Sequence, residues 1–271
     1  VGLFVCLVSV VMGIRMPLAL SPGIWMVSLS LYVVVAAGLP VWLILQPRDF
    51  INSFMLYAGM AVLVAGVLAG SLGGVSMQMP ALNLAEGNRT GGLVWPFLFI
   101  TVACGAISGF HAMVSGGTTS KQVETEVAAR GVGYGGMLLE AVLAILVVSA
   151  VGVGLNLEDY KALVYPKTSV GVGSNPVLAF ALGMSGLLHQ GLSIPMEYGT
   201  VFGMLMVEGF IVTTLDTAVR LNRYLFDEIW SALIPNPPRW LRHPLFNAGL
   251  ASGLMLLLCV TNSFRYIWHI F

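Results

Sequence analysis

Charged side chains are scarce in this sequence. The 271 residues include 12 lysines and arginines and 12 aspartates and glutamates, which is 9% charged, whereas a soluble domain carries about 25%. The chain is 58% hydrophobic, with a mean hydropathy of +0.91. So few charges cannot present such an apolar chain to water, and the net charge of zero excludes a basic nucleic-acid surface. We therefore expect a protein that faces the lipid bilayer.

The sequence also lacks the motifs of common catalytic sites. It contains no GxSxG, no HExxH, no Walker loop and no nucleotide-binding glycine fingerprint. The glycines of residues 131–136 precede an apolar segment rather than following a strand, so they do not fit a phosphate cradle. Cys6, Cys104 and Cys259 are isolated in apolar stretches, and we expect buried structural thiols rather than a disulfide or metal site. We predict no enzyme activity, no cofactor and no metal.

Long apolar segments dominate what is present. A helix crosses the hydrocarbon of a bilayer with about 20 apolar residues. About seven segments approach or reach this length: Val1–Ile14, Trp25–Leu45 with a kink at Leu39–Pro40, Phe54–Leu72, Trp95–Val114, Gly133–Leu155, Tyr198–Leu215 and Phe246–Ile267. The polar residues Gln46–Asp49 would form a turn between the second and third segments.

Two further helices are expected beside these spans. Ala179–Leu192 is short and contains three glycines, which indicates a re-entrant or interfacial helix, although a span is not excluded. Asp216–Ala232 is predicted to be an amphipathic surface helix with an apolar stripe and i,i+4 charge pairs such as Asp216/Arg220. Basic residues do not fix the sidedness, because either topology gives one side an excess. The predicted fold class is an all-α polytopic transmembrane helix bundle, a single transmembrane domain over residues 1–271.

Both ends of the sequence lie in apolar runs. Val1 begins one without a charged signal-peptide region, and Phe271 closes another without a polar flank. We expect a fragment of a larger transporter, whose partner is the missing remainder of the same polypeptide.

The segment Ile100–Gln122 is unusually polar for a lipid-facing helix. On one continuous helix Ser108, His111 and Ser115 share a face, and Gly116-Gly117 would then let the backbone leave the helix before Thr118 and Thr119. Irregular backbone at membrane depth is tolerated where it lines a cavity or is buried in protein. We favour a substrate or ion path. The alternative is a packing seam of small residues whose hydroxyls bond back to preceding carbonyls.

Carboxylates inside apolar runs supply a second candidate site. Glu140 and Glu208 are expected to face the bundle interior, where they would be protonated or paired, as proton-relay residues or as structural acids. Thr213, Thr214 and Asp216 close the helix that holds Glu208 and could serve a proton or a small cation. Capping of the next helix by Asp216 is the alternative that we favour.

Four longer stretches resemble the carbon starvation protein A family of bacterial inner-membrane transporters. They are LPVWLILQPRDFINSF (Leu39–Phe54), WPFLFITVACGAISGFHAMVSGGTTSKQ (Trp95–Gln122), GYGGMLLE (Gly133–Glu140) and TTLDTAVRLNRYLFDEI (Thr213–Ile229). They occur in the family's order and cover much of the chain. Ser120-Lys121 departs from members that have proline next, and leaves the preceding glycines and threonines intact.

The resemblance implies a multi-pass protein of the bacterial inner membrane that imports pyruvate or small peptides, with pyruvate favoured, when preferred carbon is scarce. It implies coupling to a proton or a sodium ion and a chain about twice this long. By analogy with the amino acid–polyamine–organocation transporters, it implies an inverted-repeat fold with a discontinuous Trp95–Gln122 helix beside a midplane site. The polar pattern of this segment, rather than the resemblance, makes Ser108, His111, Ser115, Thr118 and Thr119 the expected substrate residues, and His111 and Glu208 would titrate along the path.

Two other functional classes remain open beside the coupled importer. An uncoupled channel or a starvation-responsive membrane sensor would use the same bundle without accumulating a substrate. An intramembrane enzyme would need a nucleophile–base pair or a metal cluster, and the spacing of the residues supplies neither.

Overall fold

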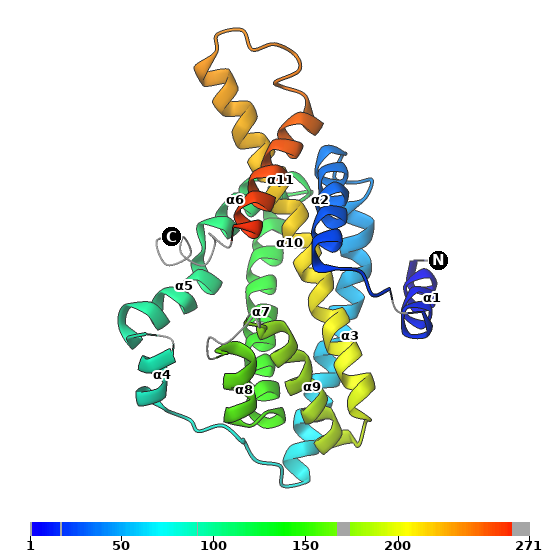
Figure 1. Cartoon of the computed structure of the whole chain (residues 1–271), viewed down its shortest axis with the longest axis vertical. Coiled ribbons are helices and arrows are strands. Elements are labelled where there is room, and N and C mark those ends of the chain that lie inside the picture. The colour runs from blue at the N-terminus through cyan, green and yellow to red at the C-terminus, as the bar shows by residue number, and fades with distance from the viewer. Residues whose placement is uncertain (1, 17, 91, 167–173, 262–271) are drawn as a thin grey trace. The chain divides into compact units, whose positions relative to one another are not determined.

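The computed structural model describes residues 2–16, 18–90, 92–166 and 174–261, and these residues form helices and loops without a strand. The α-helices are α1 (Gly2–Arg15), α2 (Pro22–Gly38), α3 (Leu45–Leu72), α4 (Leu84–Thr90), α5 (Phe99–Ile107), α6 (Gly109–Gly117), α7 (Glu126–Gly154), α8 (Leu157–Val164), α9 (Pro176–Leu192), α10 (Met196–Leu233) and α11 (Pro244–Val260) (Figure 1). The π-turn η1 (Val94–Leu98) precedes α5, and the 3-10 turn η2 (Thr119–Lys121) follows α6. The predicted all-α class is confirmed for these residues.

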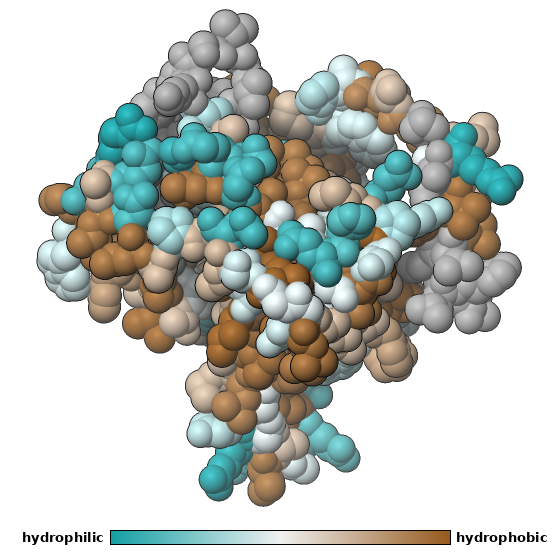
Figure 2. Space-filling model, turned by 90° about the horizontal axis from the view of Figure 1, so that it is seen from below, coloured by the Kyte–Doolittle hydropathy of each residue, from teal (hydrophilic) through white to brown (hydrophobic). Residues whose placement is uncertain are grey.

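Four helical stretches are long and apolar enough to cross a membrane: Leu45–Leu72, Val94–Lys121, Glu126–Gly154 and Met196–Leu233. The helices α2, α9 and α11 are apolar but shorter, so the expected number of about seven spans is not confirmed. Large apolar side chains are exposed along several helices, and Figure 2 shows them in brown between separate groups of hydrophilic residues. Exposed apolar surface on this scale suits contact with lipid.

The described chain forms two compact units. The first comprises Val1–Ser53 and Phe210–Phe271, and the second comprises Phe54–Gly209. In the first unit α2 packs against α11, and the buried core consists of Val33, Ala37, Val219, Ala248 and Ala251. Three of these five are alanines, so the backbones of the helices come close together.

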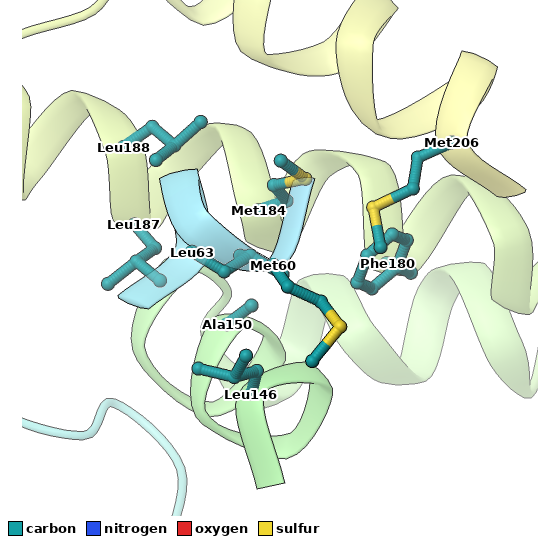
Figure 3. Packing of buried hydrophobic residues seen from close by; sticks show 9 residues of the cluster. All are labelled: Met60, Leu63, Leu146, Ala150, Phe180, Met184, Leu187, Leu188 and Met206. Atoms are coloured by element: carbon teal, nitrogen blue, oxygen red, sulfur yellow. The ribbon is translucent and has the colours of Figure 1, made fainter. Parts of the chain in front are cut away.

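The core of the second unit is built around α9. Nine side chains from α3, α7, α9 and α10 make the cluster in Figure 3: Met60, Leu63, Leu146, Ala150, Phe180, Met184, Leu187, Leu188 and Met206. Nine of the 17 residues of α9 are buried, which is more than an interfacial helix on the outside of a bundle would bury.

Glycines let α9 lie directly against its neighbours. A Cβ at Gly183 would come 2.8 Å from Cα of Val151 on α7, and a Cβ at Gly199 would come 2.9 Å from Cα of Ser185. The buried hydroxyl of Ser185 donates to the carbonyl of Met196 at 2.6 Å, which ties α9 to the first turn of α10. These helices therefore touch through backbone rather than through long side chains.

Two differences between the predicted and the observed helices lie at prolines. We predicted Trp25–Leu45 as one kinked helix, but α2 ends at Gly38, and Leu39 is extended with φ −84° and ψ 161°. A residue before proline avoids the helical region, and Pro40 has no N–H to continue the ladder. The predicted turn Gln46–Asp49 is instead the first turn of α3, where proline is tolerated because its N–H would be unpaired anyway.

Helix α10 is continuous where two helices were predicted. It runs for 38 residues, about 57 Å at 1.5 Å per residue, through the predicted end of a span at Leu215 and the predicted start of a surface helix at Asp216. The predicted stripe of Leu221, Leu225 and Ile229, spaced four residues apart, lies on this helix, with Leu221 buried and the other two exposed. Asp216 lies inside this helix, so its predicted capping role is also wrong.

Some predictions fall partly or wholly outside the described residues. Helix α11 ends at Val260, and residues 262–267 of the predicted last span lie outside, as do Val1 and the side chain of Cys6. Cys104 is half-buried and Cys259 is exposed, so the expectation of buried thiols is wrong for these two.

Candidate functional site

The first unit contains a polar cluster between α2, the start of α3 and the middle of α10. We call it the Arg48–Asp216 cluster; its members are Tyr32, Arg48, Asp49, Asn52, Thr213 and Asp216. Thr213 and Asp216 are three residues apart on α10 and therefore point to the same side of the helix. Their partners Arg48, Asp49 and Asn52 lie in the first turns of α3. The hydrogen-bonded residues Arg48 and Asp216 are 168 residues apart in the sequence.

An arginine–carboxylate pair forms the centre of the cluster. Nη1 of Arg48 donates a hydrogen bond to Oδ2 of Asp216 and a second one, of 2.5 Å, to the hydroxyl of Tyr32. The Tyr32 hydroxyl in turn donates to Oδ2 of Asp216 at 3.4 Å. The side chain of Asp216 is fully buried, whereas that of Arg48 is 21% exposed. The pair therefore lies at the boundary between the protein interior and an accessible surface.

Thr213 connects this pair to a second carboxylate. Its hydroxyl donates to Oδ1 of Asp49 at 2.9 Å and accepts from Nη2 of Arg48 and from Nδ2 of Asn52, each at 3.3 Å. Nη2 of Arg48 also lies 3.7 Å from Oδ1 of Asp49. Arg48 thus stands between two acids, one buried and one exposed.

Two buried atoms of the central pair have no hydrogen-bond partner among the described residues. They are Oδ1 of Asp216 and Nε of Arg48. A buried polar atom without a partner is costly, since its lost hydration is not replaced. Oδ1 is therefore a position that a proton or a ligand atom would stabilise.

Arg220, one turn along α10, holds the end of α2. It is 1% exposed, and its two Nη atoms donate to the carbonyls of Leu39 at 2.7 Å and Ala36 at 2.6 Å. Arg223 adds a longer bond of 3.4 Å to the carbonyl of Gly38. These carbonyls have no partner within a helix that ends here, and positive charge is favourable at a helix C-terminus. Arg220 thereby fixes α2, and Tyr32 with it, against α10. The predicted Asp216/Arg220 charge pair is replaced by Asp216/Arg48.

The second unit contains the other predicted site, and its helix is discontinuous. The chain leaves the helix at Ser108, with φ −54° and ψ 140°, and the Ser108 hydroxyl accepts the N–H of Phe110 at the start of α6. The expected discontinuity between Trp95 and Gln122 is confirmed. The shared face of Ser108, His111 and Ser115 is wrong, because Ser108 separates two helices.

The hydroxyls of this segment bond mostly to local backbone. Ser115 donates to the carbonyl of Ala112 and Ser120 to that of Gly116, as in the alternative interpretation of a packing seam. His111 and Ser115 are exposed, whereas Thr118 and Thr119 are half-buried. Oγ1 of Thr118 is buried without a partner among the described residues.

Three predicted coupling residues lie elsewhere. Glu140 on α7 and Glu208 on α10 are exposed in the described chain, and their place in the interior of the larger transporter stays a prediction. Thr214 is also exposed, unlike its neighbour Thr213. Of the predicted coupling set, the structure brings together Thr213 and Asp216 only.

The sequence analysis did not identify the members of the cluster on α2 and α3. Arg48 and Asp49 were assigned to a turn, and Tyr32 to an unremarkable span. One signal could have found Arg48: Gln-Pro-Arg-Asp fits the start of a helix, with proline in the first turn. An arginine there belongs to an apolar helix and needs a partner.

Comparison with known proteins finds relatives that are named as transporters. A protein described as "Peptide transporter CstA" from Bacillus subtilis (strain 168) is 31% identical over 275 residues, which cover 90% of this chain and 45% of that protein. "Peptide transporter CstA" from Escherichia coli (strain K12) is 33% identical, covering 77% of this chain and 36% of the relative. "Pyruvate/proton symporter BtsT" from the same strain is 30% identical, covering 75% and 36%.

The chain spans less than half of the length of these relatives. No solved structure matches it. The family model for Carbon starvation protein CstA matches residues 1–172 and 155–271. The chain belongs to the carbon starvation protein CstA family.

Proposed function

We propose that the protein is a secondary transporter that imports a small carboxylate, with pyruvate favoured, or a peptide across the bacterial inner membrane together with a proton. Relatives named as a peptide transporter and as a pyruvate/proton symporter support this function. Four helices of membrane-crossing length support a place in the bilayer. On this proposal residues 1–271 act as a single transmembrane domain, and the protein has no enzyme activity.

The observation that carries the proposal is the Arg48–Asp216 pair. A buried charged side chain is costly unless it is paired or neutralised by a proton, so such groups often serve a path for ions or substrates in membrane proteins. Asp216 is fully buried in α10 and has one carboxylate oxygen unused. A carboxylate in this setting can take up and release a proton while its arginine partner remains nearby.

The chemistry of the cluster favours a proton over a sodium ion. A sodium site needs several oxygen ligands directed at one point. Three of the oxygen-bearing groups here, those of Tyr32, Thr213 and Asp216, already accept hydrogen bonds from Arg48, and the Asp49 carboxylate accepts one from Thr213. A cation would have to displace a guanidinium of the same charge, whereas a proton needs only the unused Oδ1 of Asp216.

We keep the break at Ser108 as a second element of the proposal. The exposed N–H and C=O groups of an interrupted helix are typical of substrate sites in transporters. Ser108, His111, Ser115, Thr118 and Thr119 are proposed to contact the substrate on this basis.

Glu140, Glu208, Thr213 and Thr214 complete the proposed coupling set beside Asp216. Burial and the unused oxygen make Asp216 the first of these to test.

The test is uptake of labelled pyruvate by vesicles that contain the intact protein, with di- and tripeptides as competitors. A coupled importer accumulates pyruvate above equilibrium when a proton gradient is imposed and stops when the gradient is collapsed. Asp216→Asn should abolish accumulation, whereas Asp227→Asn, which removes the acid of the exposed Arg242–Asp227 pair, should not. Uptake that only equilibrates would instead identify the uncoupled channel, and absence of any uptake would favour the membrane sensor.

A further inference from the structure

We infer that Arg48 binds the carboxylate of the substrate, an inference that rests on the proton-coupled import proposed above. Protonation of Asp216 would free Arg48 from its ion pair, so that Arg48 can bind the substrate. The two acids, that of Asp216 and that of the substrate, then take turns as the partner of one guanidinium. Coupling would follow from this exchange alone, because the substrate could bind only when the proton is present.

Arg48 has unused capacity for a second partner. A guanidinium carries five N–H donors in a planar fork that fits a carboxylate with two parallel hydrogen bonds. Nη1 of Arg48 serves Asp216 and Tyr32, but Nη2 makes only the long 3.3 Å bond to Thr213, and Nε makes none among the described residues. The edge formed by Nε and Nη2 is therefore the edge that an incoming carboxylate would use. The side chain is 21% exposed, so a ligand can approach it, but Nε is buried and the groups that cover it must shift before both donors meet the carboxylate.

The charge of the cluster stays constant through the exchange. The charged groups facing Asp216 are Arg48 and Asp49 on α3 and Arg220 on α10, and the titratable hydroxyl of Tyr32 faces it from α2. Two arginines and two acids sum to zero. When a proton binds Oδ1 of Asp216 and one substrate carboxylate binds Arg48, the added charges cancel and the sum is again zero. A low-dielectric site favours this paired entry over either charge alone.

Each partner has a place after the exchange. Protonated Asp216 keeps its Oδ2 as an acceptor for Tyr32, and the proton removes the negative charge from the carboxylate whose Oδ1 lacked a partner. Asp49 remains bonded to Thr213 and is 42% exposed, so it competes weakly for Arg48 across 3.7 Å. The substrate therefore meets an arginine whose strongest partner has become neutral.

The substrate class recognised in this way is a carboxylate. Pyruvate is a carboxylate, and a peptide ends in one, so a single arginine would explain relatives named for either substrate. Other groups that contact the substrate would then decide between them. Neutral analogues provide the discriminating probes, since methyl pyruvate and a C-terminally amidated dialanine lack the anionic group.

Calorimetric binding to the intact protein in nanodiscs tests the exchange directly. Titrations of pyruvate in buffers of different ionisation enthalpy report the number of protons taken up. We expect the wild type to take up one proton per pyruvate and to bind more tightly as pH falls. We expect Asp216→Asn to bind pyruvate without proton uptake and with an affinity independent of pH.

Removal of the guanidinium should abolish recognition of the anion. Arg48→Gln should bind pyruvate at least about tenfold more weakly, as loss of a charge-assisted pair implies, and should no longer prefer pyruvate to methyl pyruvate. Because Arg48→Gln leaves Asp216 buried and unpaired, the double variant Arg48→Gln/Asp216→Asn removes both charges and protects the fold. Arg242→Gln is the matched control and should behave as the wild type.

Three outcomes decide the matter. If the folded Arg48→Gln/Asp216→Asn variant binds pyruvate as tightly as Asp216→Asn, Arg48 does not bind the carboxylate. If Asp216→Asn still takes up a proton with pyruvate, Asp216 does not control its release. If the wild type binds neither pyruvate nor dialanine, the proposed function itself fails, which separates that failure from failure of the exchange.

Discussion

Substitution of Gly183 by alanine should loosen the second unit. Gly183 is buried in α9, where its Cβ would lie 2.8 Å from Cα of Val151, 3.1 Å from the carbonyl oxygen of Ala150 and 3.2 Å from the Val151 nitrogen. All three are backbone atoms of α7, so no side chain can rotate away. Carbon atoms pack at about 3.5–4.0 Å, and α7 and α9 must therefore separate by roughly 1 Å.

The energetic cost follows from this separation. Overpacking of a close interface costs about 1–3 kcal/mol, because neighbouring contacts such as those of Leu146 and Met184 are lost as the helices move apart. Alanine recovers up to about 1 kcal/mol of helix propensity. The matched control is Gly136→Ala in α7, where a Cβ meets nothing within 4 Å, so only the propensity gain applies.

Thermal unfolding of the purified protein in detergent, followed by circular dichroism, measures the difference. Gly183→Ala should unfold at a lower temperature than the wild type, and Gly136→Ala at the same or a higher temperature. Equal or greater stability of Gly183→Ala would refute the close contact between α7 and α9.

Three further predictions concern the supports of the proposed sites. Arg220→Met should destabilise the protein by about 3 kcal/mol, because two charge-assisted hydrogen bonds to the end of α2 are lost. Amide hydrogen exchange at the end of α2 should become faster, and Arg220→Lys should restore part of the protection. Unchanged exchange would contradict this role of Arg220. Ser108→Ala should lower the free energy of unfolding by about 1 kcal/mol, because it removes the N-cap of α6, and Ser108→Asn should restore the thermal stability. Equal stability of the wild type and both variants would count against the cap. The hydrogen bond from Arg89 holds the pKa of Glu86 below its ordinary value. The ion pair between Glu86 on α4 and Lys161 is therefore present above that ordinary pKa and is lost as pH falls through the lowered pKa. A spin label at residue 88 should become more mobile in that pH range, and mobility that is independent of pH would argue against the ion pair.

Local chemistry made several features of the fold predictable. The apolar segments of the sequence predicted the positions of the long helices α3, α7 and α10. Gly116-Gly117 and the following threonines predicted the end of α6. The start of α3 and the middle of α10, which carry the cluster, were misjudged for one reason. Polar residues at a presumed membrane boundary were interpreted as turns or caps, although each belongs to a continuing helix.

Half of the candidate site was predictable. Thr213 and Asp216 were recognised as oxygen donors gathered on one stretch of chain. Their partner Arg48 lies 168 residues away in sequence, and neither periodicity nor spacing reports a pairing at that distance. Glu208 and Glu140 were expected in the interior because both lie in apolar runs, but composition does not tell which face of a helix is buried.

The central claim is that protons enter with the substrate through Asp216. The most direct measurement is the pH of a lightly buffered suspension of proteoliposomes, without an imposed gradient, when pyruvate is added outside. The account predicts that the external medium becomes more alkaline with the wild type and with Asp227→Asn, and that it does not change with Asp216→Asn, although that variant is inserted and folded. Alkalinisation by Asp216→Asn equal to that of the wild type would contradict the claim.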